Sequence, residues 1–106
     1  AERGEFVQAG PLRFEGEVDR QLLALERPLE VWQRSGAGYR PLWRVEQSGL
    51  PDAVVWNIGA AKAGGLSDLG PGEWRRYLCV EAAHIAAPKR LEPGQKLVGL
   101  QRLVRL

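Results

Sequence analysis

The pattern of apolar and polar positions along the chain is that of a protein built from strands. Residues 11–18 (PLRFEGEV) alternate apolar or small residues with charged ones, and this period of two is typical of an antiparallel strand with one buried face. Other short runs rich in β-branched and aromatic residues are also predicted to be strands, at residues 29–34, 40–47, 52–58 and 74–85. The pattern therefore predicts an all-β protein.

Glycine and proline mark the expected connections. Residues 35–39 (SGAGY) suit a hairpin loop, and residues 92–95 (EPGQ) suit the turn of a terminal hairpin over residues 89–106. The leucines of this last stretch also fit a helical stripe, but the Pro-Gly turn favours strands. Residues 59–73 are rich in glycine and small residues and are too long for a tight turn, so we expect one short helical turn there. Long loops of this kind often carry function.

Length and composition indicate a single globular domain over residues 1–106. The hydrophobic fraction of 44% is enough for a modest core. Fifteen Lys and Arg residues against thirteen Asp and Glu residues leave a net charge of +2, and the two signs alternate along the chain. This argues against nucleic acid or a membrane surface as the main partner. There is no methionine, not even at position 1, and we expect the chain to be part of a longer polypeptide.

The cysteine content and the hydropathy pattern indicate a cytoplasmic protein. No apolar run approaches the ~18 residues of a membrane span, and no charged start followed by an apolar stretch indicates a signal peptide. Cys79 is the only cysteine and lies in an apolar run, so we interpret it as a small buried hydrophobic residue in a reducing compartment.

One carboxylate stands out, because Glu81 interrupts the apolar run YLCVEAAHIAA and burial of a charge is costly unless something holds it. If residues 77–85 are extended, Glu81 and His84 point to opposite faces, so no local acid–base pair is expected. His84, the only histidine, is then expected at a strand end or on the surface. On the residues alone, a structural glutamate held by Arg75 or Arg76 is as good an interpretation as a functional one.

Three stretches, in this order, resemble the C-terminal part of the aldose 1-epimerase superfamily. They are FEGEVDR (residues 14–20), a stretch running from VVWN through KA and SDLG to EWRRYLCVEAA (residues 54–83), and LEPGQ (residues 91–95). The resemblance covers residues 5–106 and is strongest to the D-hexose-6-phosphate mutarotases, or glucose-6-phosphate 1-epimerases. It does not include the N-terminal half or more of that family.

The resemblance implies a fold and a reaction. The fold would be the C-terminal portion of a large antiparallel β-sandwich, the galactose mutarotase-like supersandwich. The reaction would interconvert the α and β anomers of an aldose 6-phosphate such as glucose 6-phosphate, with no metal and no nucleotide cofactor. The expected partner is therefore a small-molecule sugar phosphate.

The resemblance also implies roles for four residues. The catalytic base of the family falls on Glu81, in CVEAA, where it would remove the proton from the C1 hydroxyl. An apolar strand suits this role because burial makes a carboxylate a stronger base. An aspartate that contacts sugar hydroxyls falls on Asp19, which would otherwise be interpreted as a turn residue. Asn57 and Lys62 would line the pocket or contact the phosphate, with stabilisation of the loop as the alternative.

The chain also departs from the family pattern. It has WNIGAAK where the family usually has a proline after WN, and the family's general-acid histidines and most of its phosphate-binding arginines belong to the N-terminal part. His84 matches none of these histidines. The resemblance therefore implies that this chain supplies the base but not the acid, and that it is inactive alone.

Two other classes of function remain open. One is a non-catalytic carbohydrate-binding β-sandwich, which would need at least two of its four tryptophans exposed in one concave patch. The other is a structural or assembly module. In that case exposed strand edges would pair with a second copy or with the missing N-terminal half.

Overall fold

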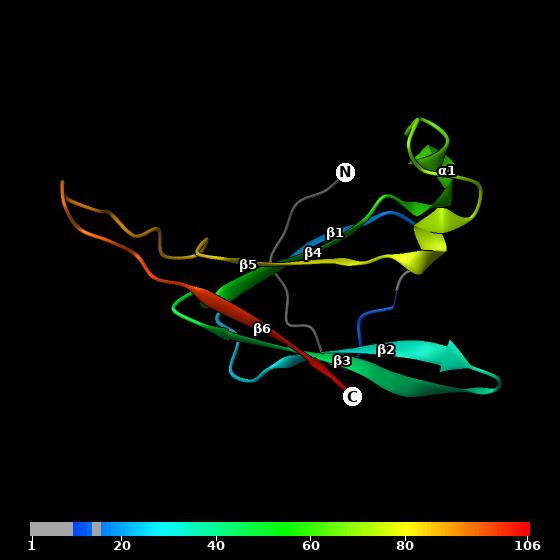
Figure 1. Cartoon of the computed structure of the whole chain (residues 1–106), viewed down its shortest axis with the longest axis horizontal. Helices are drawn as coiled ribbons and strands as arrows, with labels where there is room; N and C mark the ends of the chain where they lie inside the picture. Colours follow the sequence, from blue (N-terminus) through cyan, green and yellow to red (C-terminus); the bar gives the residue numbers. More distant parts are fainter. Residues whose placement is uncertain (1–9, 14–15) are drawn as a thin grey trace. The chain divides into compact units, whose positions relative to one another are not determined.

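The structure is a computed structural model that describes residues 10–13 and 16–106. Its strands form two three-stranded sheets, with the orders β1-β4-β5 and β2-β3-β6 (Figure 1). The strands are β1 (Val18–Leu22), β2 (Leu29–Ser35), β3 (Gly38–Ser48), β4 (Asp52–Asn57), β5 (Cys79–Ala83) and β6 (Leu100–Arg105). Helical structure is limited, in the described part of the chain, to α1 (Gly59–Ala63) and a short 3-10 helix, η1 (Glu73–Arg76). The all-β prediction is confirmed.

The chain divides into two compact units. The smaller unit comprises residues up to 18 together with residues 57–77, and it contains α1 and η1. The larger unit comprises residues 19–56 and 78–106, and it contains the two sheets apart from one terminal residue each of β1 and β4. The expectation of one domain over residues 1–106 stays a prediction.

The strands of the second sheet are organised around β3. Strands β2 and β3 form the predicted hairpin, in which Ser35 pairs with Gly38 across the two residues Gly36 and Ala37. Gly36 has a φ of 60°, which glycine adopts without steric cost. On its other side β3 pairs with β6, from Ser48 opposite Leu100 to Trp43 opposite Arg105.

Two strand predictions were wrong in their position. Of the described residues in the alternating stretch 11–18, only Val18 belongs to a strand, because β1 begins there, where the chain gains β4 as a neighbour. Phe14 and Glu15 lie outside the described residues. The stretch 74–85 begins as η1, because Gly72 adopts a φ of 72° and its carbonyl accepts the Arg75 N–H. The strand itself starts only at Cys79.

The predicted terminal hairpin over residues 89–106 was also wrong. The turn is present, with the Gln95 N–H donating to the Glu92 carbonyl at 3.0 Å. However, residues 84–99 contain no strand and run as a long excursion between β5 and β6 (Figure 1). Strand β6 pairs with β3 instead of with the preceding residues, along the edge of β3 that β2 leaves open.

A buried aspartate fixes the start of β4. Asp52 is 1% exposed, and its Oδ1 accepts the Ala24 N–H at 2.8 Å. Its Oδ2 accepts the N–H groups of Ile85 and Ala86 at 2.6 and 3.0 Å. One carboxylate thus ties the segments that follow β1 and β5 to β4, and so helps to hold the three strands of the first sheet together.

Candidate active site

The pairing of β4 with β5 determines which way Glu81 points. Glu81 lies directly opposite Val54, and Cys79 lies opposite Trp56. Because directly opposed residues in an antiparallel pair point to the same side, these four residues share one face of the sheet, called here the Glu81 face. The other face carries Ala53 and Val55, which are 0% and 6% exposed. The core therefore lies behind Glu81 and not around it.

The side chain of Glu81 is exposed, contrary to the expectation that its apolar surroundings bury it. The residues on either side of it in β5 are only partly buried. The carboxylate forms no hydrogen bond or ion pair with any residue that the structure describes. The arginine clamp considered from the sequence is not formed either, and the Arg75 guanidinium lies instead 5.1 Å from the centroid of the Trp74 ring.

Asp19 belongs to the same sheet as Glu81. Val18 is buried and Asp19 is exposed, so the alternation of β1 turns Asp19 away from the core and toward the same side as Glu81. Strand β4 lies between β1 and β5. Since neighbouring strands are spaced by about 4.8 Å, β1 and β5 lie about 10 Å apart across the sheet.

Asn57 belongs to the smaller unit, where its amide holds the loop together. The residue is 0% exposed, and its Nδ2 donates to the carbonyls of Trp74 and Tyr77, both at 2.8 Å. Its Oδ1 accepts the Gly59 N–H at 2.9 Å. The polar atoms of this side chain are therefore engaged in shaping the loop, which is the alternative that the sequence left open for Asn57.

Lys62 lies on α1, also in the smaller unit, and its side chain is 66% exposed. Its Nζ lies 3.0 and 3.2 Å from the two carboxylate oxygens of Glu17. An exposed pair of this kind contributes little to stability, so the ammonium group remains available to an anion that competes with Glu17. Asn57 and Lys62 thus belong to the smaller unit, and Asp19 and Glu81 to the larger one.

Sequence reasoning missed two polar residues with structural roles. Asp52 accepts the three hydrogen bonds that link the segments after β1 and β5 to β4. A signal for this role was its position directly after Pro51 and before four apolar residues. Tyr77 was considered only as part of a strand, but its hydroxyl accepts the Ile58 N–H at 3.0 Å. Nothing in the local pattern indicates that contact, because the two residues are 19 positions apart.

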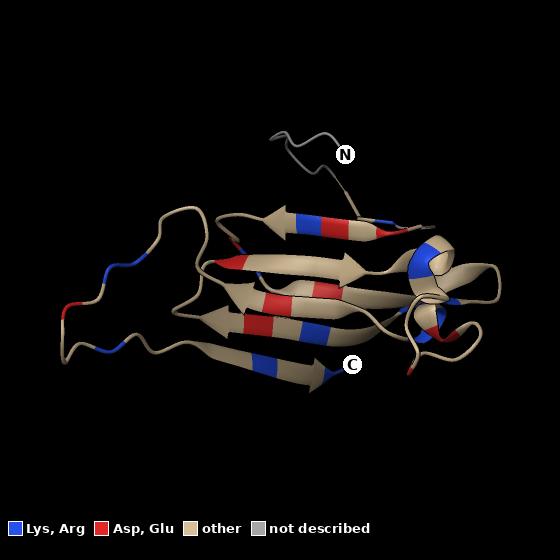
Figure 2. Cartoon of the chain, turned by 90° about the horizontal axis from the view of Figure 1, so that it is seen from above, with Lys and Arg blue, Asp and Glu red and all other residues tan. Residues whose placement is uncertain are grey.

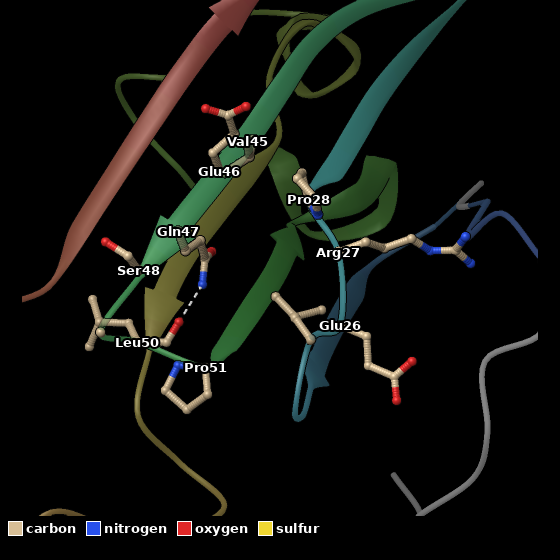
Figure 3. Close-up of a pocket in the computed structure, with 11 residues that line it drawn as sticks. Glu26, Arg27, Pro28, Val45, Glu46, Gln47, Ser48, Leu50 and Pro51 are labelled. Carbon is tan, nitrogen blue, oxygen red and sulfur yellow. Dashed lines mark hydrogen bonds between the residues drawn. The ribbon is translucent and has the colours of Figure 1, made fainter.

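A hollow of about 480 Å³ lies in the larger unit, between the segment 25–28 and the end of β3 with the turn that follows it (Figure 3). Gln47 lines it, and its Nε2 donates to the carbonyls of Leu50 and Asp52, both at 2.9 Å. These bonds fix the turn between β3 and β4. None of the four residues predicted for the site lines this hollow.

The tryptophans of the second sheet do not form a common stacking surface. Trp43 lies opposite Val31 in the β2–β3 pairing, while Trp32, the next residue of β2, points to the other side. The Trp32 indole N–H donates to Glu30 Oε1 at 3.2 Å, as expected for two residues that share a face. This pair therefore does not provide the two-tryptophan patch that a carbohydrate-binding module would need.

The surface charges give no large region of one sign on the described strands. Acidic and basic residues are interspersed over them, and β1 and β3 each carry both (Figure 2). Within residues 10–13 and 16–106, no helix is long and apolar enough to cross a membrane.

Comparison with known proteins points to one kind of enzyme. The chain is 36% identical, over 92 residues, to a protein of Cenchrus ciliaris described as "Putative glucose-6-phosphate 1-epimerase". The match covers 87% of this chain and 27% of that protein. The chain is similar to part of a protein with an epimerase name. It spans only about a quarter of that relative's length. No protein-family model matches the chain, and no solved structure matches it.

Proposed function

We propose that this chain is the part of a glucose-6-phosphate 1-epimerase that carries the catalytic base, and that the base is Glu81. The observation that carries the proposal is the exposed carboxylate of Glu81, which has no partner among the described residues and lies on the side of the sheet to which Asp19 also points. The similarity to a protein with an epimerase name supports the reaction class.

The chemistry requires one group that accepts a proton and one that donates a proton. Glu81 would take the proton from the C1 hydroxyl as the bond between C1 and the ring oxygen breaks, and an acid would protonate the ring oxygen. The open-chain aldehyde then rotates about the C1–C2 bond and closes, with the two roles reversed. Among the described residues, the Glu81 face carries no histidine or lysine next to Glu81, so the acid would come from elsewhere in a longer polypeptide.

The remaining predicted residues would bind the substrate. Asp19 would accept hydrogen bonds from two sugar hydroxyls, which a carboxylate does well because both of its oxygens are acceptors. Lys62 would give up its exposed contact with Glu17 and bind the substrate phosphate, which carries more negative charge than a carboxylate. Asn57 would act indirectly, by fixing the backbone of the loop that leads into α1. With a single cysteine and a phosphorylated substrate, the protein would work in the cytoplasm.

A chimera tests the proposal. The stretch of the Cenchrus ciliaris protein that matches this chain is replaced by the chain itself, and the decay of optical rotation is followed in fresh α-glucose 6-phosphate. We expect the chimera to speed equilibration and the 106-residue chain alone to be close to the uncatalysed rate. A folded chimera without activity, alongside an active parental relative, would reject the proposal.

A further inference from the structure

Lys62 lies on a helix that is too short to be stable by itself. Helix α1 has five residues, whereas isolated helices shorter than ~12 residues are marginal even for sequences that favour helix. The residue that precedes it, Ile58, makes no side-chain capping bond to the helix. The position of Lys62 therefore depends on the contacts that other residues of the smaller unit make with α1.

Two side chains bind the start of α1. The Tyr77 hydroxyl accepts the Ile58 N–H at 3.0 Å, and Asn57 Oδ1 accepts the Gly59 N–H at 2.9 Å. N–H groups at the start of a helix have no acceptor within the helix, so these two side chains supply the acceptors that α1 lacks. The two are also joined to each other, since Asn57 Nδ2 donates to the Tyr77 carbonyl at 2.8 Å. Of the two, Tyr77 is the one that reaches α1 from far along the chain.

The first residue of α1 also lies against the backbone of the residue that pairs with Lys62. Gly59 has a φ of 73°, and a Cβ added to it would clash with the backbone nitrogen of Glu17. The carboxylate of Glu17 lies 3.0 and 3.2 Å from Lys62 Nζ. Glu17, Gly59 and Lys62 all belong to the smaller unit. The placement of the start of α1 thus determines where the Lys62 ammonium group lies.

We propose that Tyr77 is a positioning residue for Lys62. By accepting the Ile58 N–H, the Tyr77 hydroxyl holds α1 where Lys62 binds the phosphate group of the substrate. Tyr77 acts through α1 and does not itself contact the substrate. This inference rests on the proposed function, in which Lys62 is a phosphate ligand.

The first test uses the epimerase chimera. Tyr77→Phe keeps the ring but removes the acceptor of the Ile58 N–H. We expect KM for glucose 6-phosphate to rise about three- to tenfold, with kcat and the KM for glucose nearly unchanged, because only phosphate binding is weakened. Tyr39→Phe makes the same change at the other tyrosine of the chain, on β3, and should leave both KM values at the parental level.

A double variant separates positioning from a general loss of structure. In a Lys62→Ala background, Tyr77→Phe is expected to cause no further rise in KM for glucose 6-phosphate, because the residue that Tyr77 positions is gone. An equal rise with and without Lys62 would overturn the proposal. So would an equal rise in KM for glucose 6-phosphate and for glucose, since the phosphate is then not involved.

The second test does not need activity. In the 106-residue chain, amide hydrogen exchange measured by NMR should become about tenfold faster for residues 58–63 in Tyr77→Phe, and should stay parental in Tyr39→Phe. Parental exchange in Tyr77→Phe would show that the hydroxyl does not hold α1. A chimera without activity would reject the proposed function and this inference together. An active chimera that responds to Tyr77→Phe no more than to Tyr39→Phe would reject this inference alone.

Discussion

Glu81 lies directly opposite Val54 in the pairing of β5 with β4, and this relationship places its carboxylate on the face of the sheet that lies away from the core. The neighbouring residues of β4, Ala53 and Val55, point the other way and are buried. The carboxylate of Glu81 therefore belongs to an apolar strand but remains exposed to solvent. It stays accessible, without an ion pair among the described residues, in a three-stranded sheet that also contains β1, the strand of Asp19.

Replacing Glu81 by Gln is expected to leave the stability unchanged. The carboxylate is exposed and has no partner in the described part of the chain, so the free energy of unfolding should change by less than about 0.5 kcal/mol. Urea denaturation measures this. A loss of several times that value would mean that Glu81 is held by an interaction and is structural.

Replacing Asp52 by Asn makes the same chemical change in the same sheet, with a different expected result. Whichever way the amide is turned, at least one of the three N–H groups that Asp52 now binds loses its acceptor in a buried site. We expect a loss of about 1 to 3 kcal/mol. Equal urea midpoints for the Asp52→Asn variant and the parent protein would show that the clamp contributes nothing.

Asp52 should also determine part of the acid sensitivity. Burial disfavours its charged form, but the three backbone N–H groups and the nearby His84 outweigh burial and hold the pKa of Asp52 below its ordinary value of 3.8. A group whose pKa is lower in the folded state contributes stability above its unfolded value, and this is lost as the pH falls through the folded value. Stability should thus decline below about pH 3.8, and less so in Asp52→Asn, as followed by urea midpoints against pH.

Replacing Asn57 by Ala should destabilise the smaller unit. The change leaves two carbonyls and one N–H without the partner that the buried amide provides, at a cost of about 2 to 4 kcal/mol. Asn57→Asp keeps the acceptor for Gly59 but not the two donors, and is expected to lose most of the same stability. If both variants unfold at the parental urea concentration, Asn57 is not the residue that shapes this loop.

Replacing Lys62 by Ala tests its role toward phosphate in the epimerase chimera. Its pair with Glu17 is exposed, so stability should change by less than about 1 kcal/mol. We expect KM for glucose 6-phosphate to rise about tenfold, which corresponds to ~1.4 kcal/mol of binding, with little change for glucose. Lys89→Ala, another exposed lysine, serves as the control. An equal effect on both sugars would separate Lys62 from phosphate recognition.

Local pattern was enough to predict the strand content and the hairpin between β2 and β3. The apolar run at residues 52–58 and the glycines after Ser35 both specify their structure within a few residues, and both predictions are confirmed. The short helical turn after Asn57 is confirmed as α1 for the same reason, since small residues leave the backbone free to coil there.

Local pattern was not enough where a partner from far away in the chain decides the structure. Strand β6 was predicted to pair with the residues just before it, but it pairs with β3, which lies far earlier in the sequence. For the same reason, the prediction that its apolar neighbours in the sequence bury Glu81 was wrong. Which face of β5 is buried depends on the packing of the whole sheet, and not on the composition of the run.

The most direct test of the account is the exchange rate between the α and β anomers of glucose 6-phosphate, measured by NMR with the epimerase chimera and its Glu81→Gln variant. Glutamine keeps the shape of the side chain but does not accept the proton, so we expect the rate to fall by ~10² to 10⁴ while the fold and stability are retained. Glu92→Gln, an exposed glutamate in the segment between β5 and β6, should exchange at the parental rate. If the Glu81→Gln chimera exchanges the anomers as fast as its parent, Glu81 is not the base.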